Sequence, residues 1–282
     1  MPEVFKFRKG ELSKDLGIRD FDIMSRVYPQ YVLFSKKYGN KVFYNLGLNL
    51  IIMVTSPSLV KEILLDVGNY HKARPSTFVL SALVGKSLLT MNGEEWANHR
   101  QVFAPAFCVE VLKGLVNKIT TKSITSRLDI WEEKVQDGGG LMELEVHHEI
   151  CIITMQAISH MLFSNIDQKT QQVFIQLKTL FETMSQATTN PFFTIPGYRF
   201  AKDVSKACQD PQGFIPFSFG PRYCIGQNLA VLQSKLIVAK VLSRFQLSVS
   251  PNYIHNPQHL TILTPKFGVQ LHVKKLPPSI SS

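Results

Sequence analysis

Apolar positions recur at helical spacing in the first quarter of the chain. Residues 22–38 place apolar side chains three or four positions apart, at Ile23, Val27, Tyr31, Phe34 and Tyr38. This pattern predicts a helix that ends at Gly39-Asn40. Two short strand-like runs follow, 41–47 and 50–55, and a further helix is expected over 57–66 with Pro57 in its first position.

The middle of the chain is predicted to be helical. Asn92 and Glu95 form a capping-box pattern, which predicts a helix that runs to about Phe103. Three longer helical stretches are then expected over 108–135, 143–163 and 167–187, the first of them ended by the glycines at 138–140.

The last third combines loop, helix and sheet. Residues 190–224 are rich in Pro, Gly and aromatic side chains and predict extended loop, whereas 225–245 is amphipathic at helical spacing. Residues 260–264 and 269–273 flank Pro265-Lys266-Phe267-Gly268 and predict a hairpin. The fold class is therefore mainly α with a small β-sheet.

Composition narrows the class of protein. In 282 residues, 45% are hydrophobic and 18% charged, which is typical of a globular chain. The net charge of +10 is compatible with nucleic acid, an anionic membrane surface or an acidic protein as partner. The basic residues are scattered, which argues against nucleic acid. No apolar run is long enough to span a membrane or to act as a signal peptide, and four widely spaced cysteines favour a reducing compartment.

The segment around Cys224 carries the chemistry. A thiolate placed just before a helix lies near free N–H groups and the positive end of the helix dipole. Gly226 keeps bulk away from a flat ligand, Gly220 permits a tight turn, and Phe217 can shield the sulfur from water. Arg222 is suited to pairing with a carboxylate. The alternative without a functional role is that Cys224 is an inert cysteine at the start of a helix.

The pattern Phe217-x-x-Gly220-x-Arg222-x-Cys224-x-Gly226 resembles the haem-binding signature of the cytochrome P-450 monooxygenases. The resemblance implies a P-450-like fold and haem b as cofactor, with Cys224 as the axial thiolate ligand of the iron. Arg222 would then pair with a haem propionate. The sequence around the signature most resembles that of plant members that act on hormone-like or terpenoid substrates.

A second match supports the first. Trp96-x-x-x-Arg100 places both side chains on one helix face, and in the family these two residues hydrogen-bond a haem propionate. Similarity to sequences of the family extends to Gly93, to residues 100–107 and to the strand-strand-helix run 41–66.

Two parts of the family pattern are missing. The central oxygen-activating helix carries an acid–alcohol pair, and here Ala187-Thr188-Thr189 lacks the acid. No arginine has a glutamate three residues before it, so the Glu-x-x-Arg helix is missing too. We expect an internal junction at 198/199, which divides the chain into an amino-terminal part, 1–198, and a part with the haem loop, last helix and terminal hairpin, 199–282.

The resemblance implies a monooxygenase that inserts one oxygen atom of dioxygen into a small hydrophobic substrate. Its electrons would come from an NADPH-dependent flavoprotein reductase at the cytosolic face of the endoplasmic reticulum membrane, although the family's membrane anchor is absent. Two alternatives stay open: a truncated, non-catalytic haem-binding protein, and an incomplete gene model or splice form that does not fold stably. The expected reductase-facing cations are Lys113, Lys118, Lys122, Arg127, Lys235, Lys240 and Arg244.

The remaining candidate ligands are less specific. His147 and His160 are too far apart along one expected helix for joint metal ligation, and the adjacent His147 and His148 are expected to point apart. His99 is expected to be exposed. The segment His71-Lys72-Ala73-Arg74 precedes the Trp96 helix and could lie at the haem edge. Cys108 and Cys151 are expected to be small core residues.

Overall fold

The computed structural model describes residues 2–14, 16–20, 22–39, 42–46, 49–72, 85–162, 215–259 and 263–277. The chain forms two compact units, each drawn from separate stretches of sequence. One holds the described parts of 1–104, 181–225 and 257–264; the other holds the described parts of 105–180, 226–256 and 265–282. The predicted division at 198/199 lies outside the described residues and stays a prediction.

The first unit combines short helices with small two-stranded sheets. Its main elements are α1 (Pro2–Leu12), α2 (Met24–Val27), α3 (Pro29–Tyr38), β1 (Val42–Leu46), β2 (Asn49–Met53), α4 (Pro57–Leu65) and α6 (Gly93–Phe103). Strands β1 and β2 are antiparallel, with Phe43 opposite Ile52. The two strands and α4 thus confirm the sequence prediction, and Pro57 does stand at the first helical position.

The helix expected over 22–38 is interrupted. Tyr28 leaves the helical region with φ −129° and ψ 63°, so α2 ends at Val27 and α3 begins at Pro29. The cause is local, because a residue before proline is disfavoured in the helical region. Helix α1 was not predicted, since residues 2–12 carry too few apolar positions at helical spacing to mark a helix.

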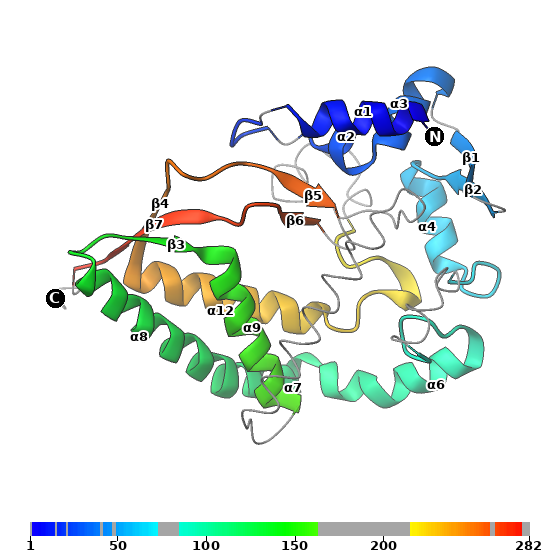
Figure 1. Ribbon diagram of the computed structural model, residues 1–282. Coiled ribbons are helices and arrows are strands. Elements are labelled where there is room, and N and C mark those ends of the chain that lie inside the picture. Colours follow the sequence, from blue (N-terminus) through cyan, green and yellow to red (C-terminus); the bar gives the residue numbers. More distant parts are fainter. Residues whose placement is uncertain are drawn as a thin grey trace. The chain divides into compact units, whose positions relative to one another are not determined.

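The second unit combines long helices with a three-stranded sheet (Figure 1). Its elements are α7 (Val109–Leu115), a π-helical turn (Val116–Thr120), α8 (Thr121–Asp137), β3 (Met142–Glu145), α9 (Val146–Leu162), α12 (Gln227–Arg244), β4 (Phe245–Val249) and β7 (Gln270–Lys275). The sheet order is β3-β7-β4 and both pairings are antiparallel. The long helices expected over 108–135 and 225–245 are confirmed.

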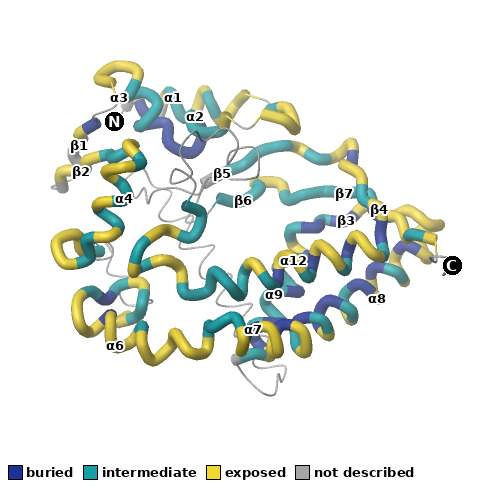
Figure 2. Tube along the Cα trace, turned by 180° about the vertical axis from the view of Figure 1, so that it is seen from behind, coloured by how far each residue is buried: buried dark blue, intermediate teal, exposed yellow. Residues whose placement is uncertain are grey.

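The core of this unit lies between α8, α9, α12 and the sheet, where the buried residues gather in Figure 2. Trp131 of α8 and Phe245 of β4 are almost fully buried, and their ring centroids lie 5.7 Å apart in a tilted arrangement. Burying two rings of this size, with that geometry, is a large apolar contribution to stability.

The helix expected from residue 143 instead begins at Val146, after strand β3. Glu145 explains the boundary. Its carboxylate accepts hydrogen bonds from the backbone N–H groups of His147, at 3.1 Å, and His148, at 2.7 Å. It also accepts one from Val269 N–H at 2.7 Å, next to β7. One side chain therefore caps α9 and joins it to the sheet, which the local pattern does not reveal.

The terminal hairpin was predicted wrongly. Strand β6 (Leu263–Pro265) pairs with β5 (Pro257–His259), whereas β7 pairs with β3 and β4. The alternating apolar pattern is common to all these strands, so it does not select the partner of each.

The described residues form a mainly helical fold with small sheets, as the sequence indicated. None of the helices within these ranges is long and apolar enough to cross a membrane. The predicted helix 167–187 and most of the predicted loop 190–224 lie outside the described residues.

Candidate functional site

Cys224 lies in a tight loop that folds back on itself. The amide of Cys224 donates a hydrogen bond to the carbonyl oxygen of Phe217 at 2.8 Å, and the thiol is exposed. Between them, Ser218 and Gly220 have φ of +65° and +72°, and Gly220–Arg222 forms a short 3₁₀ turn. Gly226 is the N-cap residue of α12, so the long helix begins three residues after Cys224.

Gly220 is required by a close approach as well as by its backbone angle. A Cβ atom at this position would lie 2.6 Å from the carbonyl oxygen of Leu64 in α4. No real side chain tolerates that distance to a backbone atom, and left-handed angles already disfavour other residues. The loop therefore packs closely against α4 because residue 220 has no side chain. Phe217 is half-buried and meets Cys224 through its carbonyl oxygen.

Arg222 joins the cysteine loop to the loop after α4. Its guanidinium donates to the carbonyl oxygens of Tyr70, at 2.6 Å, and Val67, at 2.8 Å. Its Nε is buried and has no hydrogen-bond partner within the described part of the chain. The described residues thus satisfy the charged group only in part, which is unfavourable unless a further acceptor is bound.

Helix α6 brings Trp96 and Arg100 to the same loop. The guanidinium carbon of Arg222 lies 5.9 Å from the centre of the Trp96 ring, and that of Arg100 lies 4.7 Å from the ring of Tyr223. Trp96 is 9% exposed. The three residues predicted to meet a propionate are therefore brought to one loop, in which Arg222 and Tyr223 directly precede Cys224.

Two residues that the motifs did not single out also belong to this place. Lys72 has its amino group 5.5 Å from the centre of the Trp96 ring, and Tyr223 supplies the ring under Arg100. Lys72 belongs to the segment 71–74 that the sequence predicted as a possible haem-edge segment, and residues 73 and 74 lie outside the described residues. No sequence motif identifies Tyr223, whose position between Arg222 and Cys224 is the only indication of a role.

The site is strongly cationic. Lys72, Arg100 and Arg222 gather around two aromatic rings, and none of them forms an ion pair with a carboxylate in the described ranges. Burial lowers the pKa of Lys72, and the nearby charges of Arg222 and Arg100 lower it further. Such a cluster is matched to a ligand that carries more than one negative charge.

The other candidate ligands do not form a site. His99 is exposed, as expected, and its Nδ1 lies 2.8 Å from the Glu95 carbonyl oxygen. His147 lies 3.8 Å from the sulfur of Cys151 on the same helix. Within the residues that the structure describes, no three side chains that could hold a metal ion come together.

Comparison with known proteins identifies the family. The family model for cytochrome P450 matches residues 22–201 and 197–273, two stretches that overlap at residues 197–201. The chain is 21% identical to cytochrome P450 714C1 of Oryza sativa subsp. japonica over 446 positions, covering 95% of the chain and 87% of the relative. Because the chain has 282 residues, a long stretch of that relative has no counterpart here.

Other relatives align over shorter segments. Cytochrome P450 72A15 of Arabidopsis thaliana is 31% identical over 188 residues, which cover 67% of the chain. The chain spans 36% of that relative and 38% of cytochrome P450 714C2 of Oryza sativa subsp. japonica, little more than a third of their length.

Solved structures agree with the fold. A zebra fish cytochrome P450 in a structure with progesterone superposes with a TM-score of 0.65 at 14% identity, covering 88% of this chain and all of that one. A six-coordinated cytochrome P450 from Thermus thermophilus gives 0.59 at 14% identity, covering 87% and 98%. With a family model that matches most of its length and a fold of the same kind, the chain belongs to the cytochrome P450 family.

Proposed function

We propose that this chain binds haem with Cys224 as the axial thiolate ligand. The cytochrome P450 family has haem as its cofactor, with an iron centre and a cysteine thiolate ligand. The observation that carries the proposal is the juxtaposition of the exposed Cys224 loop with a cation-rich cluster that has no described carboxylate partner.

The residues present fit a group that carries two propionates. Arg222 has a buried Nε with no described acceptor, and its guanidinium lies beside the ring of Trp96. In the proposal these donors and Arg100 bind propionate oxygens, whereas Gly220 and Gly226 keep side chains away from the macrocycle. The hydrogen bond from Cys224 N–H to Phe217 fixes the loop, and the half-buried Phe217 limits water near the sulfur.

When bound, haem iron supplies the binding and reductive activation of dioxygen. In the intact family this serves to insert one oxygen atom into an organic substrate, and we propose a monooxygenase of small hydrophobic substrates as the ancestral activity. The proposal extends to an NADPH-dependent flavoprotein reductase as electron donor and to the endoplasmic reticulum membrane as location.

A second function is favoured by the sequence itself. The chain contains no Glu-x-x-Arg, and the threonines at 188 and 189 have no acid before them. These residues lie outside the described part, and the sequence alone carries the point. A non-catalytic haem-binding protein is the function that needs the Cys224 loop and the α6 cluster but not the oxygen-activating helix.

Haem titration separates Cys224 from the other cysteines. The full chain is expected to bind one haem, and Cys224→Ala is expected to weaken binding by at least tenfold, because a metal–ligand bond is lost. Cys108→Ala is the matched control, since Cys108 is a half-buried free cysteine outside the site. Equal haem affinity in the two variants would contradict the proposed role of Cys224.

The proposed reductase contact rests on a smaller set of cations than the sequence suggested. Arg127 is paired with Glu149, and Arg244 with Asp129 at 2.6 Å. Lys113, Lys118, Lys122 and Lys235 are exposed and form no ion pair with a described carboxylate.

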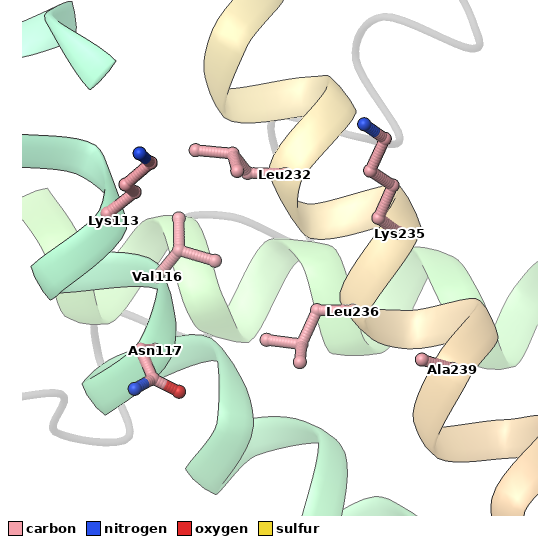
Figure 3. Close-up of a pocket in the computed structure, with 7 residues that line it drawn as sticks. All are labelled: Lys113, Val116, Asn117, Leu232, Lys235, Leu236 and Ala239. Atoms are coloured by element: carbon pink, nitrogen blue, oxygen red, sulfur yellow. The ribbon is translucent and has the colours of Figure 1, made fainter. Parts of the chain in front are cut away.

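Two of these lysines flank an apolar groove between α7 and α12 (Figure 3). It is lined by Lys113, Val116, Asn117, Leu232, Lys235, Leu236 and Ala239. The lysines give this groove a basic border.

Reductase binding should depend strongly on salt. Exposed charges are screened over about 10 Å at 0.1 M salt, so affinity for an acidic flavoprotein reductase should fall steeply as salt rises. Lys113→Glu with Lys235→Glu is expected to lower the association rate by roughly an order of magnitude, measured by surface plasmon resonance. Lys274→Glu with Lys266→Glu alters the charge equally elsewhere in the unit and serves as control. Binding that is indifferent to ionic strength would refute this contact.

A further inference from the structure

The β1–β2 hairpin has one covered face and one apolar face that is open to solvent. Phe43 of β1 stands opposite Ile52 of β2, and the two side chains are 59% and 56% exposed. Leu50, on the same face as Ile52, is 63% exposed. On the other face Val42 is buried and Ile51 is half-buried. Large apolar side chains therefore meet water along one side of this hairpin.

The sequence of β2 is typical of a strand that has neighbours. Residues 50–53 are all apolar, whereas a strand with one solvated face alternates apolar and polar positions. Charged residues and proline are the features that keep an exposed edge from pairing, and residues 42–56 contain neither. Within the described part of the chain, β2 pairs only with β1. Its second edge is therefore open and unprotected.

The open edge carries the backbone groups of Leu50 and Ile52. Leu46 pairs with Asn49 across a connection of two residues, and in such a hairpin the closing pair is the hydrogen-bonded kind. Hydrogen-bonded and non-hydrogen-bonded pairs alternate along an antiparallel ladder, so residues 50 and 52 direct their N–H and C=O groups away from β1. Each of these two residues therefore offers a donor and an acceptor at the edge.

A second copy of the same strand fits this edge. If two β2 strands lie antiparallel with Ile51 opposite the partner's Ile51, then Leu50 of each strand stands opposite Ile52 of the other. These two pairs are then hydrogen-bonded and use every outward group of residues 50 and 52. The exposed aliphatic side chains become cross-strand neighbours on one face. The arrangement has two-fold symmetry, which closes the assembly as a dimer.

The edge of β1 is less suited to such pairing. Its outward groups belong to residues 43 and 45, so self-pairing about Tyr44 would place Phe43 opposite Asn45, an aromatic residue opposite an amide. Lys41 also directly precedes β1, whereas the first charged residue after β2 is Lys61. Self-pairing is therefore favoured at β2.

We propose that the chain forms a weak symmetric dimer through antiparallel pairing of two β2 strands. The occupant of the edge is a second copy, because the strand is complementary to itself and carries no charge that would repel its copy. A five-residue strand gives a small contact, so the dissociation constant should be on the order of 10 µM or above. The dimer does not require haem and is independent of the function proposed above.

Sedimentation equilibrium of the full chain, at concentrations that span this value, measures the dimer. Leu50→Lys should raise the dissociation constant at least about tenfold, because it places a charge at the pairing edge. Leu89→Lys is the matched control, since Leu89 is 70% exposed elsewhere in the same unit, and its dissociation constant should equal that of the wild type. A wild type that stays monomeric, or equal weakening by the two substitutions, would overturn the inference.

Salt should act on this dimer in the direction opposite to its effect on the reductase contact. Two chains of net charge +10 repel each other, and salt screens that repulsion. The β2 contact itself contains no ion pair, so the dissociation constant should fall as salt rises. A dimer that dissociates at high salt would be held by charges and would contradict pairing through β2.

Mixed variants test the register. Leu50→Lys and Ile52→Glu should each dimerise poorly, but their mixture should recover much of the wild-type affinity, because the register places the introduced lysine of one chain opposite the introduced glutamate of the other. Ile52→Lys mixed with Ile52→Glu should recover less, since those positions lie diagonally across the pair. Equal recovery in the two mixtures would contradict the register. Recovery by mixing also shows that neither variant had lost its fold.

A lipid bilayer is the alternative occupant of the exposed apolar face. Flotation with phosphatidylcholine vesicles separates it from a second copy. The wild type should remain with the unbound protein while it dimerises in solution. A wild type that is monomeric and floats with the vesicles, together with a Leu50→Lys variant that does not, would assign the face to a membrane and overturn the dimer.

Discussion

Replacing Arg127 by methionine should lower the free energy of unfolding by about 3–5 kcal/mol. Arg127 and Glu149 form a two-point ion pair, with Nε 2.5 Å and Nη2 2.6 Å from the two carboxylate oxygens. The Glu149 side chain is only 6% exposed, and it also accepts a hydrogen bond from the indole N–H of Trp131 at 2.7 Å. Without Arg127 the carboxylate would be a buried charge that lacks its cation.

The pH dependence of this variant has a definite sign. Burial alone raises the pKa of Glu149, but the hydrogen bonds from Arg127 and Trp131 outweigh it and leave the pKa below the ordinary 4.5. In the wild type this stabilises the fold above the unfolded-state pKa, and the contribution is lost as pH falls through the lowered value. Without Arg127, burial raises the pKa of Glu149. Protonation of Glu149 then removes the buried negative charge and stabilises the variant. The difference between the two proteins should therefore shrink from pH 7 to pH 4.

Urea unfolding followed by circular dichroism measures both effects. Lys122→Met is the matched control, because it removes an equal charge from an exposed residue of α8 and should change stability by less than about 0.5 kcal/mol. Adding Glu149→Gln to Arg127→Met should recover part of the loss, since a neutral amide still accepts from Trp131. A loss below about 1 kcal/mol for Arg127→Met, or one that grows toward pH 4, would refute this account of the pair.

Gly220→Ala should lower stability by about 2–5 kcal/mol and disrupt the cysteine loop. The backbone of Gly220 has φ +72°, and an added Cβ would meet the carbonyl oxygen of Leu64 at 2.6 Å. Both effects move the loop away from α4. Arg222 moves with the loop and is drawn away from the carbonyl oxygens of Val67 and Tyr70. Haem affinity should fall together with stability, because the loop carries Cys224.

A second glycine separates the two causes. Gly93, at the start of α6, has φ +58° and nothing within 4 Å of an added Cβ. Gly93→Ala therefore tests backbone strain alone and should lower stability by about 1–2 kcal/mol. Urea unfolding and haem titration of the two variants would show the contribution of the contact with Leu64. Equal losses would mean that the close approach to α4 has no energetic role.

The sequence predicted most of the helices and the essential motif, because both are local patterns. Pro57 located the start of α4, helical spacing located α8 and α12, and the spacing from Phe217 to Gly226 located the cysteine loop. The break at Tyr28 follows from Pro29 and could have been predicted. The partners of β7 could not, because alternation in one strand does not show which strand lies beside it.

The sequence predicted the site residues that belong to motifs, but it did not predict the residues that contact them. Trp96, Arg100 and Arg222 stand in recognisable patterns, and the structure brings them together. Lys72 and Asn92 are twenty residues apart, and Tyr223 lies far along the chain from Arg100, so their contacts are products of tertiary folding. Asn92 illustrates the limit: its capping-box pattern is real in the sequence, but its amide binds Lys72 instead.

The reduced, CO-bound absorption spectrum of the full chain tests the central claim most directly. A haem iron held by the Cys224 thiolate should give a thiolate-type Soret band, and Cys224→Ala should abolish it while Cys108→Ala leaves it unchanged. A wild-type chain that binds haem without this band, or a band that persists in Cys224→Ala, would contradict the assignment of Cys224 as the ligand.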